Sequence, residues 1–203
     1  MAIPCSTSVA DAPWIWRSDY SGARNQDMSL TKVVILGLGG LCIGFLSLPA
    51  WRAGWKHAWP RSLAFLAILA LLLLNLEAWV LQPFEARQVL SWLLLMTSVG
   101  LALPAFVVLR RHGRPQGSID FTISLVTAGV YRFLRHPLYA SLIFLAWGTL
   151  LKRVVPSTII LASAATLLLF ATAKLEEGFN FAKFGPPYAD YVRRTKMFVP
   201  LLV

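Results

Sequence analysis

Long apolar runs without a charged residue recur along the chain and alternate with short charged segments. Four runs are long enough for a membrane span: Val33–Trp51, Ser62–Leu76 with an extension past Glu77 to Leu81, Gln88–Leu109 and Val154–Ala173. A helix rises about 1.5 Å per residue, so roughly 20 apolar residues cross the hydrocarbon core of a bilayer. The pattern therefore predicts an all-α, polytopic membrane protein.

A fifth run, Leu138–Leu151, is shorter and lies between Pro137 and Lys152. As a helix it would be about 21 Å long, which is less than the roughly 30 Å of hydrocarbon. It would either span a thinned region or form half of a tight hairpin with the next helix. We expect about five transmembrane helical segments in all, followed by a cytoplasmic C-terminal helix.

The composition supports a membrane protein, because 57% of the residues are hydrophobic and only 14% are charged. Soluble domains have about 25% charged residues. So much apolar surface excludes a disordered chain, and it argues against a nucleic-acid partner, which needs a water-soluble body behind a basic face. Cys5 and Cys42 have no CxxC spacing, and we expect no metal centre.

The charge is strongly positive, with 19 Lys and Arg against 9 Asp and Glu, a formal charge of +10. If the chain crosses five times, thirteen of the 19 basic residues lie on the side of the C-terminus. Cytoplasmic loops carry the excess of Lys and Arg, so the C-terminus is predicted to be cytoplasmic. Basic clusters such as Arg110–Arg114 would contact anionic headgroups.

The chain divides into three parts. Residues 1–29 form a polar segment with Trp14, Trp16 and Tyr20, which is either an interfacial anchor or the product of a mis-assigned start codon before Met28. Residues 30–109 hold the first three transmembrane helices. Residues 110–203 hold a long polar loop, two membrane segments and the C-terminal helix, and here the polar residues with a chemical role concentrate.

The loop before the fourth segment ends in Arg135-His-Pro-Leu-Tyr139. A residue that precedes proline is held out of the helical region, so His136 is predicted to be non-helical. Tyr139 follows about one turn into the next helix. Both side chains can therefore face one pocket at the membrane surface.

The last membrane run continues as a predicted helix through Lys174 until Gly185-Pro-Pro187 stops it. Glu176, Asn180 and Lys183 are spaced to share one face of this helix. The adjacent Glu176 and Glu177 are either a solvated helix segment or, together with the His-Pro loop, the surroundings of a cationic ligand.

Five motif elements occur in order between Gln116 and Pro200. They are Leu125-Val-Thr-x-Gly-x-Tyr131, Arg135-His-Pro-x-Tyr139, Glu176-Glu177, Phe184-Gly-x-x-Tyr188-x-x-Tyr191 and Pro200. This series resembles the membrane-embedded methyltransferases that include isoprenylcysteine carboxyl methyltransferases and phospholipid N-methyltransferases. Upstream of it, the chain matches that family only as hydrophobic spans.

The resemblance implies methyl transfer from S-adenosyl-L-methionine at the cytoplasmic membrane face, by a methyltransferase core within residues 110–203. By motif position, the expected cofactor contacts are Gln116, Ile123, Ser124, Leu125, Val126, Tyr131, His136, Pro137, Leu138, Tyr139 and Glu176. In-line displacement from sulfur depends mainly on positioning. If the acceptor arrives protonated, Glu177 or His136 would be the general base.

Two departures from the family pattern matter: the first argues against a prenylcysteine carboxylate as the acceptor, and the second concerns packing. Carboxyl methyltransferases of the prenylcysteine type place an arginine where this chain has Thr172, and the usual glycine after the motif tyrosine is replaced in Ala140-Ser141. The expected acceptor is a membrane lipid or another amphiphile that enters sideways. The alternatives are a small diffusible thiol or amine, or a non-catalytic membrane scaffold with the same fold. The oligomeric state stays open.

Overall fold

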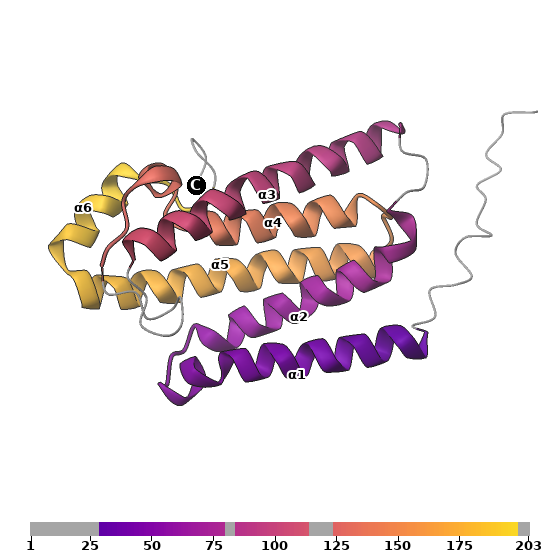
Figure 1. Cartoon of the computed structure of the whole chain (residues 1–203), viewed down its shortest axis with the longest axis horizontal. Helices are drawn as coiled ribbons and strands as arrows, with labels where there is room; N and C mark the ends of the chain where they lie inside the picture. The colour runs from indigo at the N-terminus through magenta and orange to yellow at the C-terminus, as the bar shows by residue number, and fades with distance from the viewer. Residues whose placement is uncertain (1–28, 80–83, 114–123, 199–203) are drawn as a thin grey trace, which may run out of the picture.

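The computed structural model describes residues 29–79, 84–113 and 124–198, and its helices run side by side along one axis (Figure 1). Along the chain the elements are α1 (Leu30–Arg52), α2 (Ala58–Asn75), η3 (Leu76–Ala78), α3 (Ala86–His112), η5 (Gly129–Arg132), α4 (Pro137–Leu150), α5 (Pro156–Phe184) and α6 (Pro186–Arg194). In these ranges the only β-pairing is an isolated parallel bridge between Leu134 and Lys196. The predicted all-α fold class is confirmed. Predictions that fall on residues 1–28, 80–83, 114–123 and 199–203, including the extension of the second run to Leu81, lie outside the described residues.

The described helices cover all five predicted runs. Four stretches are long and apolar enough to cross a membrane, namely α1, Ala58–Ala78, α3 and α5. The α5 helix continues through Lys174 and ends at Phe184 before Gly185, as predicted. The predicted C-terminal helix is the last part of α5, whereas the separate helix α6 was not predicted, because Pro186-Pro187 was interpreted only as a stop. Proline is also well suited to the first turn of a new helix, because a backbone N–H in that turn has no hydrogen-bond acceptor within the helix.

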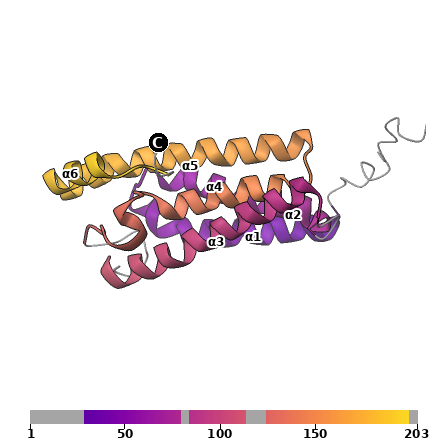
Figure 2. The same cartoon turned by 90° about the horizontal axis from the view of Figure 1, so that it is seen from above.

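The short α4 helix is the fifth predicted segment. It lies between α3 and α5 and spans about 21 Å, whereas the antiparallel α5 spans about 43 Å. A short turn joins the end of α4 to the start of α5, so the extra length of α5 extends past the beginning of α4. Figure 2 shows this extension from a second direction. The bundle therefore has a space at the end where α4 begins.

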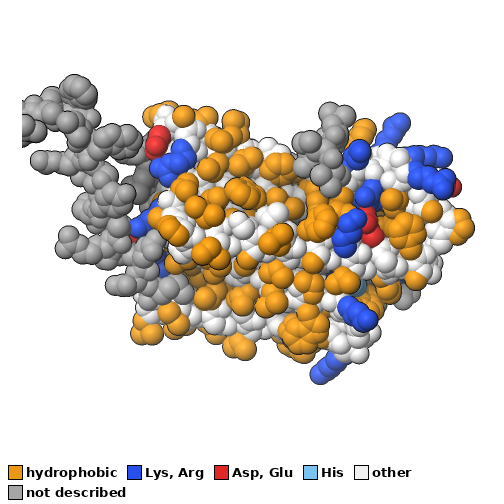
Figure 3. All heavy atoms as spheres, turned by 180° about the vertical axis from the view of Figure 1, so that it is seen from behind, with side chains coloured by type: hydrophobic (Ala, Val, Ile, Leu, Met, Phe, Trp, Pro, Cys, Tyr) orange, Lys and Arg blue, Asp and Glu red, His pale blue; other side chains and the backbone are white. Residues whose placement is uncertain are grey.

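Small side chains form the contact between α2, α4 and α5. Six alanines of this core are at most 1% exposed: Ala64, Ala140, Ala146, Ala162, Ala165 and Ala173. In a membrane there is little hydrophobic drive to associate helices, so small residues stabilise contacts by allowing close approach. The outer surface is apolar through the middle of the bundle, and Lys and Arg gather at the end where α6 lies (Figure 3).

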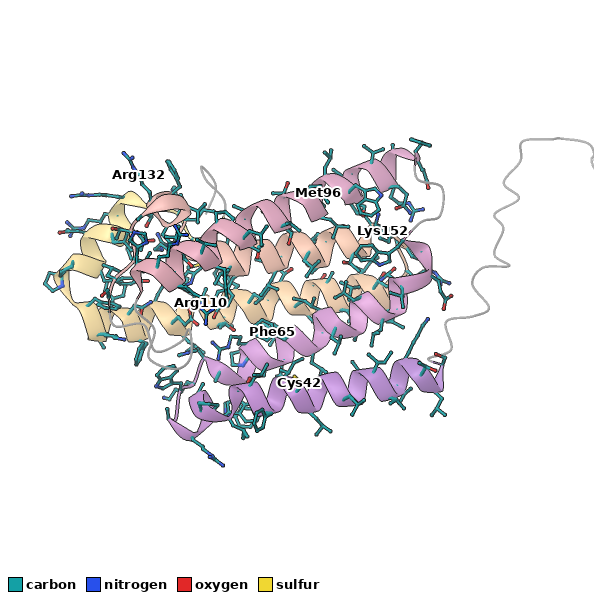
Figure 4. All side chains as sticks on the ribbon, in the orientation of Figure 1. Cys42, Phe65, Met96, Arg110, Arg132 and Lys152 are labelled. Atoms are coloured by element: carbon teal, nitrogen blue, oxygen red, sulfur yellow. The ribbon has the colours of Figure 1, made fainter. Side chains whose placement is uncertain are left out.

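At the opposite end of the bundle, the buried Lys152 connects the α4–α5 turn to α3. Figure 4 shows this residue far from Arg110 and Arg132, which mark the other end. The ammonium of Lys152 lies 3.7 Å from the centre of the Trp92 ring and donates to Gln88 Oε1 at 3.1 Å. Burial lowers the pKa of Lys152. Arg87 donates to the carbonyl of Lys152 at 3.1 Å, so the α4–α5 turn is fixed to α3.

Helices α3 and α4 approach each other closely at Gly148. An added Cβ there would lie 3.0 Å from Leu95 Cδ2 and 3.2 Å from the carbonyl oxygen of Ser91. The Ser91 hydroxyl donates to the Gly148 carbonyl at 2.7 Å. A larger residue would force the two helices apart and break this hydrogen bond.

We expect Gly148→Leu to destabilise the detergent-solubilised protein by about 1–3 kcal/mol, because overpacking a close helix contact has about that cost. Thermal unfolding, read as a lower Tm, measures the effect. Gly100→Leu is the matched control, since a Cβ at Gly100 meets nothing within 4 Å. Equal Tm values for the two variants would contradict the close contact at Gly148.

Candidate active site

A cavity of about 620 Å³ lies at the end of the bundle where α4 begins. Its walls come from α1, α2, α3, α4, α5, α6 and the segment before α4. One part is lined by charged and polar groups, including Arg61, His136 and Glu176. Another part reaches apolar residues of the bundle, including Leu46 and Phe65. The cavity therefore combines a polar region with an apolar extension toward the hydrocarbon.

The structure brings most of the expected site residues to this cavity. Those that line it are Ser124, Leu125, Val126, Tyr131, His136, Pro137, Leu138, Tyr139 and Glu176. Gln116 and Ile123 lie outside the described residues. Glu177 does not line the cavity. Tyr188 and Tyr191, which belong to the last long motif, line it from α6.

Glu176 is the central acidic group of the cavity. The Tyr139 hydroxyl donates to its Oε1 atom. Two imidazoles face the same carboxylate, with His57 Nε2 at 3.9 Å from Oε1 and His136 Nδ1 at 3.6 Å from Oε2. A partly buried carboxylate in such a cavity is suited to a cationic ligand, since electrostatic attraction is stronger where water is largely excluded.

His136 adopts the non-helical backbone that its place before Pro137 predicted, with φ −124° and ψ 59°. Its ring stacks on Tyr139 with the centroids 5.6 Å apart. Its Nε2 atom is buried and has no hydrogen-bond partner among the described residues. Burial lowers the pKa of His136 to about 4, so the ring is neutral at pH 7.

The segment before α4 is held in place by residues that follow α6. The backbone N–H of Arg135 donates to the Lys196 carbonyl at 2.7 Å, and that of His136 donates to the Met197 carbonyl at 3.1 Å. The Tyr191 hydroxyl donates to the Tyr131 carbonyl at 2.7 Å. These bonds pair two segments far apart in the sequence and orient the His136 backbone.

Glu177 and Arg135 form a buried ion pair beside the cavity. Arg135 Nε donates to Glu177 Oε1 at 2.7 Å, and Lys174 Nζ donates to Oε2 at 3.3 Å. The same guanidinium also donates to the carbonyls of Val192 and Thr195 at the end of α6. Both carboxylate oxygens of Glu177 are therefore engaged, and the pair fixes α6 against α5.

The corner between α1 and α2 supplies cavity residues that the sequence analysis did not single out. Gly54, with φ +72°, turns the chain after α1, in a conformation that favours glycine. Trp55, His57 and Arg61 then line the cavity. The Trp55 ring lies 5.3 Å from that of Phe179 on α5. In the sequence, His57 and Arg61 stand one helical turn apart at the start of a span, where basic residues are also typical of membrane-surface anchors.

The two departures from the family motif have different structural effects. Thr172 is fully buried, does not line the cavity and donates to its own helix at the Leu168 carbonyl at 2.7 Å. Ser141 lines the cavity, and its hydroxyl donates to the Leu138 carbonyl at 2.7 Å. Ser141 therefore fits the first turn of α4 without breaking the helix.

Comparison with known proteins identifies the enzyme class. Residues 86–186, which include all of α3, α4 and α5, match the family model described as phospholipid methyltransferase. The chain belongs to this family of membrane-embedded methyltransferases. The methyltransferase has no match among solved structures.

Two curated relatives align with most of the methyltransferase. Methanethiol S-methyltransferase 2 of Bradyrhizobium diazoefficiens is 24% identical over 85% of this chain and 73% of its own length. Methanethiol S-methyltransferase of Mycobacterium tuberculosis is 25% identical over 84% of this chain and 78% of its own length. A shorter match, 38% identical, links 39% of this chain to 37% of the cobalt-zinc-cadmium resistance protein CzcN of Cupriavidus metallidurans.

The neutral, buried His136 makes stability depend on pH. Its pKa is about 4 in the folded protein against an ordinary 6.5, so only the unfolded chain binds this proton between those values. Lowering the pH from 6.5 to 4 should therefore cost about 3 kcal/mol through this group. Unfolding in detergent as a function of pH should show a smaller loss in His136→Gln than in the wild type. The exposed His112→Gln is the control, and an unchanged slope in His136→Gln would rule out the neutral imidazole.

Proposed function

We propose that the methyltransferase transfers a methyl group from S-adenosyl-L-methionine to the sulfur of a small apolar thiol. The observation that carries this proposal is the set of polar groups around Glu176 in a cavity that extends into apolar wall. The two relatives that align over more than four-fifths of the chain are both named for S-methylation of methanethiol. The scaffold alternative is set aside because the family model is described as phospholipid methyltransferase and both of these relatives are named as methyltransferases.

The residues of the cavity fit the methyl donor. A carboxylate such as Glu176 matches its ammonium or sulfonium, and the rings of Trp55 and Phe179 suit a cation. The buried, unpartnered Nε2 of His136 can accept a hydrogen bond from a donor group of the ligand. When bound, S-adenosyl-L-methionine would supply an activated methyl group on a positive sulfur.

We assign the cofactor contacts to the residues that the motifs predicted. Ser124, Leu125, Val126 and Tyr131 would form the wall before α4, with Gln116 and Ile123 preceding them in the chain. His136, Pro137, Leu138 and Tyr139 would contact the cofactor from the start of α4, and Glu176 from α5.

The two base candidates from the sequence differ in their suitability. A general base is most effective when its pKa is near the working pH, and His136, with a pKa of about 4, is better suited to accepting a hydrogen bond. Both oxygens of Glu177 are bound to Arg135 and Lys174, which suits a positioning role.

A lipid-like or amphiphilic acceptor is the second candidate. It is favoured by the apolar residues Ile43, Leu46 and Phe65, which line the extension of the cavity. It is also favoured by the outer surface of α1, which exposes many apolar side chains. An acceptor with a chain could lie in this extension with its reactive group near Glu176. The arginine that prenylcysteine enzymes place at the position of Thr172 has no counterpart here, because Thr172 does not line the cavity.

We also propose that the cavity faces the cytoplasm. The described basic residues at this end include Arg52, Lys56, Arg110, Arg111, Arg132, Lys183, Arg193 and Arg194, on or beside helix ends that meet at the cavity. Lys32, Arg87, Lys152 and Arg153 belong to the other end. The excess indicates a cytoplasmic C-terminus in contact with anionic headgroups.

Reporter fusions test this orientation. In a bacterial inner membrane, a fluorescent protein fused after residue 203 should fluoresce, because it folds in the cytoplasm. An alkaline phosphatase fused at the same place should stay inactive. Active phosphatase together with a dark fluorescent protein would reverse the orientation.

Cofactor and acceptor are tested on the protein purified in detergent. S-Adenosylhomocysteine should bind in calorimetry, and Glu176→Gln should weaken the binding of labelled S-adenosyl-L-methionine by about tenfold or more, the effect of losing one charge-assisted contact of about 1.4–3 kcal/mol. Asp190→Asn, on the exposed face of α6, is the control. With methanethiol as the acceptor, label from the methyl donor should appear in the thioether product, dimethyl sulfide. Label confined to a lipid extract would favour the second candidate.

A further inference from the structure

The cavity has a polar group of residues that no motif of the family accounts for. His57 and Arg61 lie at the start of α2, outside the residues that match the family model. Both side chains are buried, with 5% and 8% of their surface exposed, and both line the cavity. A buried arginine and a buried histidine in one cavity are expensive to keep unless they interact with a partner or a ligand.

His57 and Arg61 lie on a different side of Glu176 from the residues that are expected to contact the cofactor. His136 and Tyr139 approach the Glu176 carboxylate from α4, whereas His57 approaches it from α2 with Nε2 at 3.9 Å. Arg61 follows His57 by one helical turn, and its backbone N–H donates to the His57 carbonyl at 3.4 Å. The α2 side of Glu176 therefore carries one imidazole and one guanidinium.

The corner that carries these residues is rigidly packed. The Trp51 and Trp59 rings stack with centroids 4.4 Å apart and an interplanar angle of 7°. Inside the hairpin, the Ser62 hydroxyl donates to the Ser47 hydroxyl at 2.8 Å. The α1–α2 hairpin thus holds His57 and Arg61 at a fixed place beside α5.

The apolar extension of the cavity begins next to the same two residues. Phe65 follows Arg61 by one turn of α2, and Leu46 adjoins Ser47 on α1. A ligand that places an anionic atom beside Arg61 would therefore direct its apolar part along Phe65 and Leu46. A small thiol has this combination of one ionisable sulfur and an apolar substituent.

We propose that the α1–α2 corner is the acceptor subsite, in which His57 removes the thiol proton and Arg61 stabilises the resulting thiolate. The proposal rests on the proposed thiol acceptor and adds the residues that activate it. A thiolate is the nucleophilic form of sulfur, and a neighbouring arginine lowers the pKa of a thiol. A neutral His57 is a suitable base because the ordinary pKa of histidine is near 6.5.

The reaction balances with these groups alone and the methyl donor. The S–H bond of the thiol breaks and its proton goes to the His57 imidazole. The sulfur lone pair forms the new C–S bond, while the electron pair of the breaking bond stays on the sulfonium sulfur. The products are a methyl thioether, neutral S-adenosylhomocysteine and a protonated His57, which releases its proton to water.

The first test measures the thiol without turnover. Benzenethiol, whose thiolate absorbs in the near-ultraviolet, is titrated with pH in the presence of the wild-type enzyme and saturating S-adenosylhomocysteine. The ratio of bound thiolate to thiol should be at least about tenfold higher than in detergent buffer at the same pH. An unchanged ratio in the wild type overturns the proposal and does not depend on how any variant folds.

Variants assign the effect to the two side chains. Arg61→Gln should abolish the tenfold excess of bound thiolate, whereas Arg61→Lys, which keeps the positive charge, should retain most of it. Equal loss in both variants would contradict an electrostatic role. His57→Gln should lower kcat/KM for methanethiol by about 10²–10⁴-fold at pH 7, the usual range for loss of a general base. The deficit should shrink as the pH rises, because more thiol ionises unaided.

Affinity for S-adenosylhomocysteine separates acceptor from cofactor roles. It should stay within about threefold of the wild type in the His57 and Arg61 variants, and a large loss in Arg61→Gln would assign this residue to the cofactor and overturn the proposal. Arg111→Gln and His112→Gln are the matched controls, since both side chains are exposed at the end of α3. If the wild type binds S-adenosylhomocysteine but methylates no thiol, the proposed function fails together with this subsite. If the wild type is active and the His57 and Arg61 variants match their controls, only the subsite fails.

Discussion

The difference in length between α4 and α5 is the constraint on which the rest of the structure depends. A short turn joins the end of α4 to the start of α5, and the two helices run antiparallel. They differ roughly twofold in length, with 14 residues in α4 and 29 in α5. Alanines pack the two helices closely where they run side by side. Beyond the start of α4, the rest of α5 has no α4 residues beside it. The space that results is walled by the α1–α2 corner, the segment before α4 and α6. Glu176 projects from α5 where this space begins, beside Tyr139.

Helix geometry points the two neighbouring carboxylates of α5 in different directions, so they have different contacts. Successive residues on a helix point about 100° apart, so Glu176 faces the cavity while Glu177 faces Arg135 and α6. Arg135 then joins Glu177 to the carbonyls at the end of α6. Removing either member of such a buried pair leaves an uncompensated charge, so the pair is a structural requirement of the wall.

The helices and the α4–α5 side of the cavity could be predicted, because each depends on local sequence. Charge-free runs mark helices that must satisfy their backbone groups in hydrocarbon. His136, Tyr139 and Glu176 stand in short motifs of fixed spacing, and the structure brings them together. His57 and Arg61 could not be found in this way. In sequence they are indistinguishable from basic anchors at a membrane surface, and their inward position depends on how the α1–α2 hairpin packs against α5. The α6 helix was missed because a double proline can end one helix and begin the next.

The pairing of residues 195–198 with residues 133–136 has a consequence for biogenesis. The backbone of Arg135 and His136 is held by carbonyls of Lys196 and Met197, some 60 positions later in the chain. A ribosome-bound chain that has inserted every membrane helix still lacks these carbonyls. The cavity end of the bundle can therefore close only after translation has passed Met197. If this cavity is the active site, as we propose, an enzyme still being synthesised is expected to be inactive even when it is fully inserted.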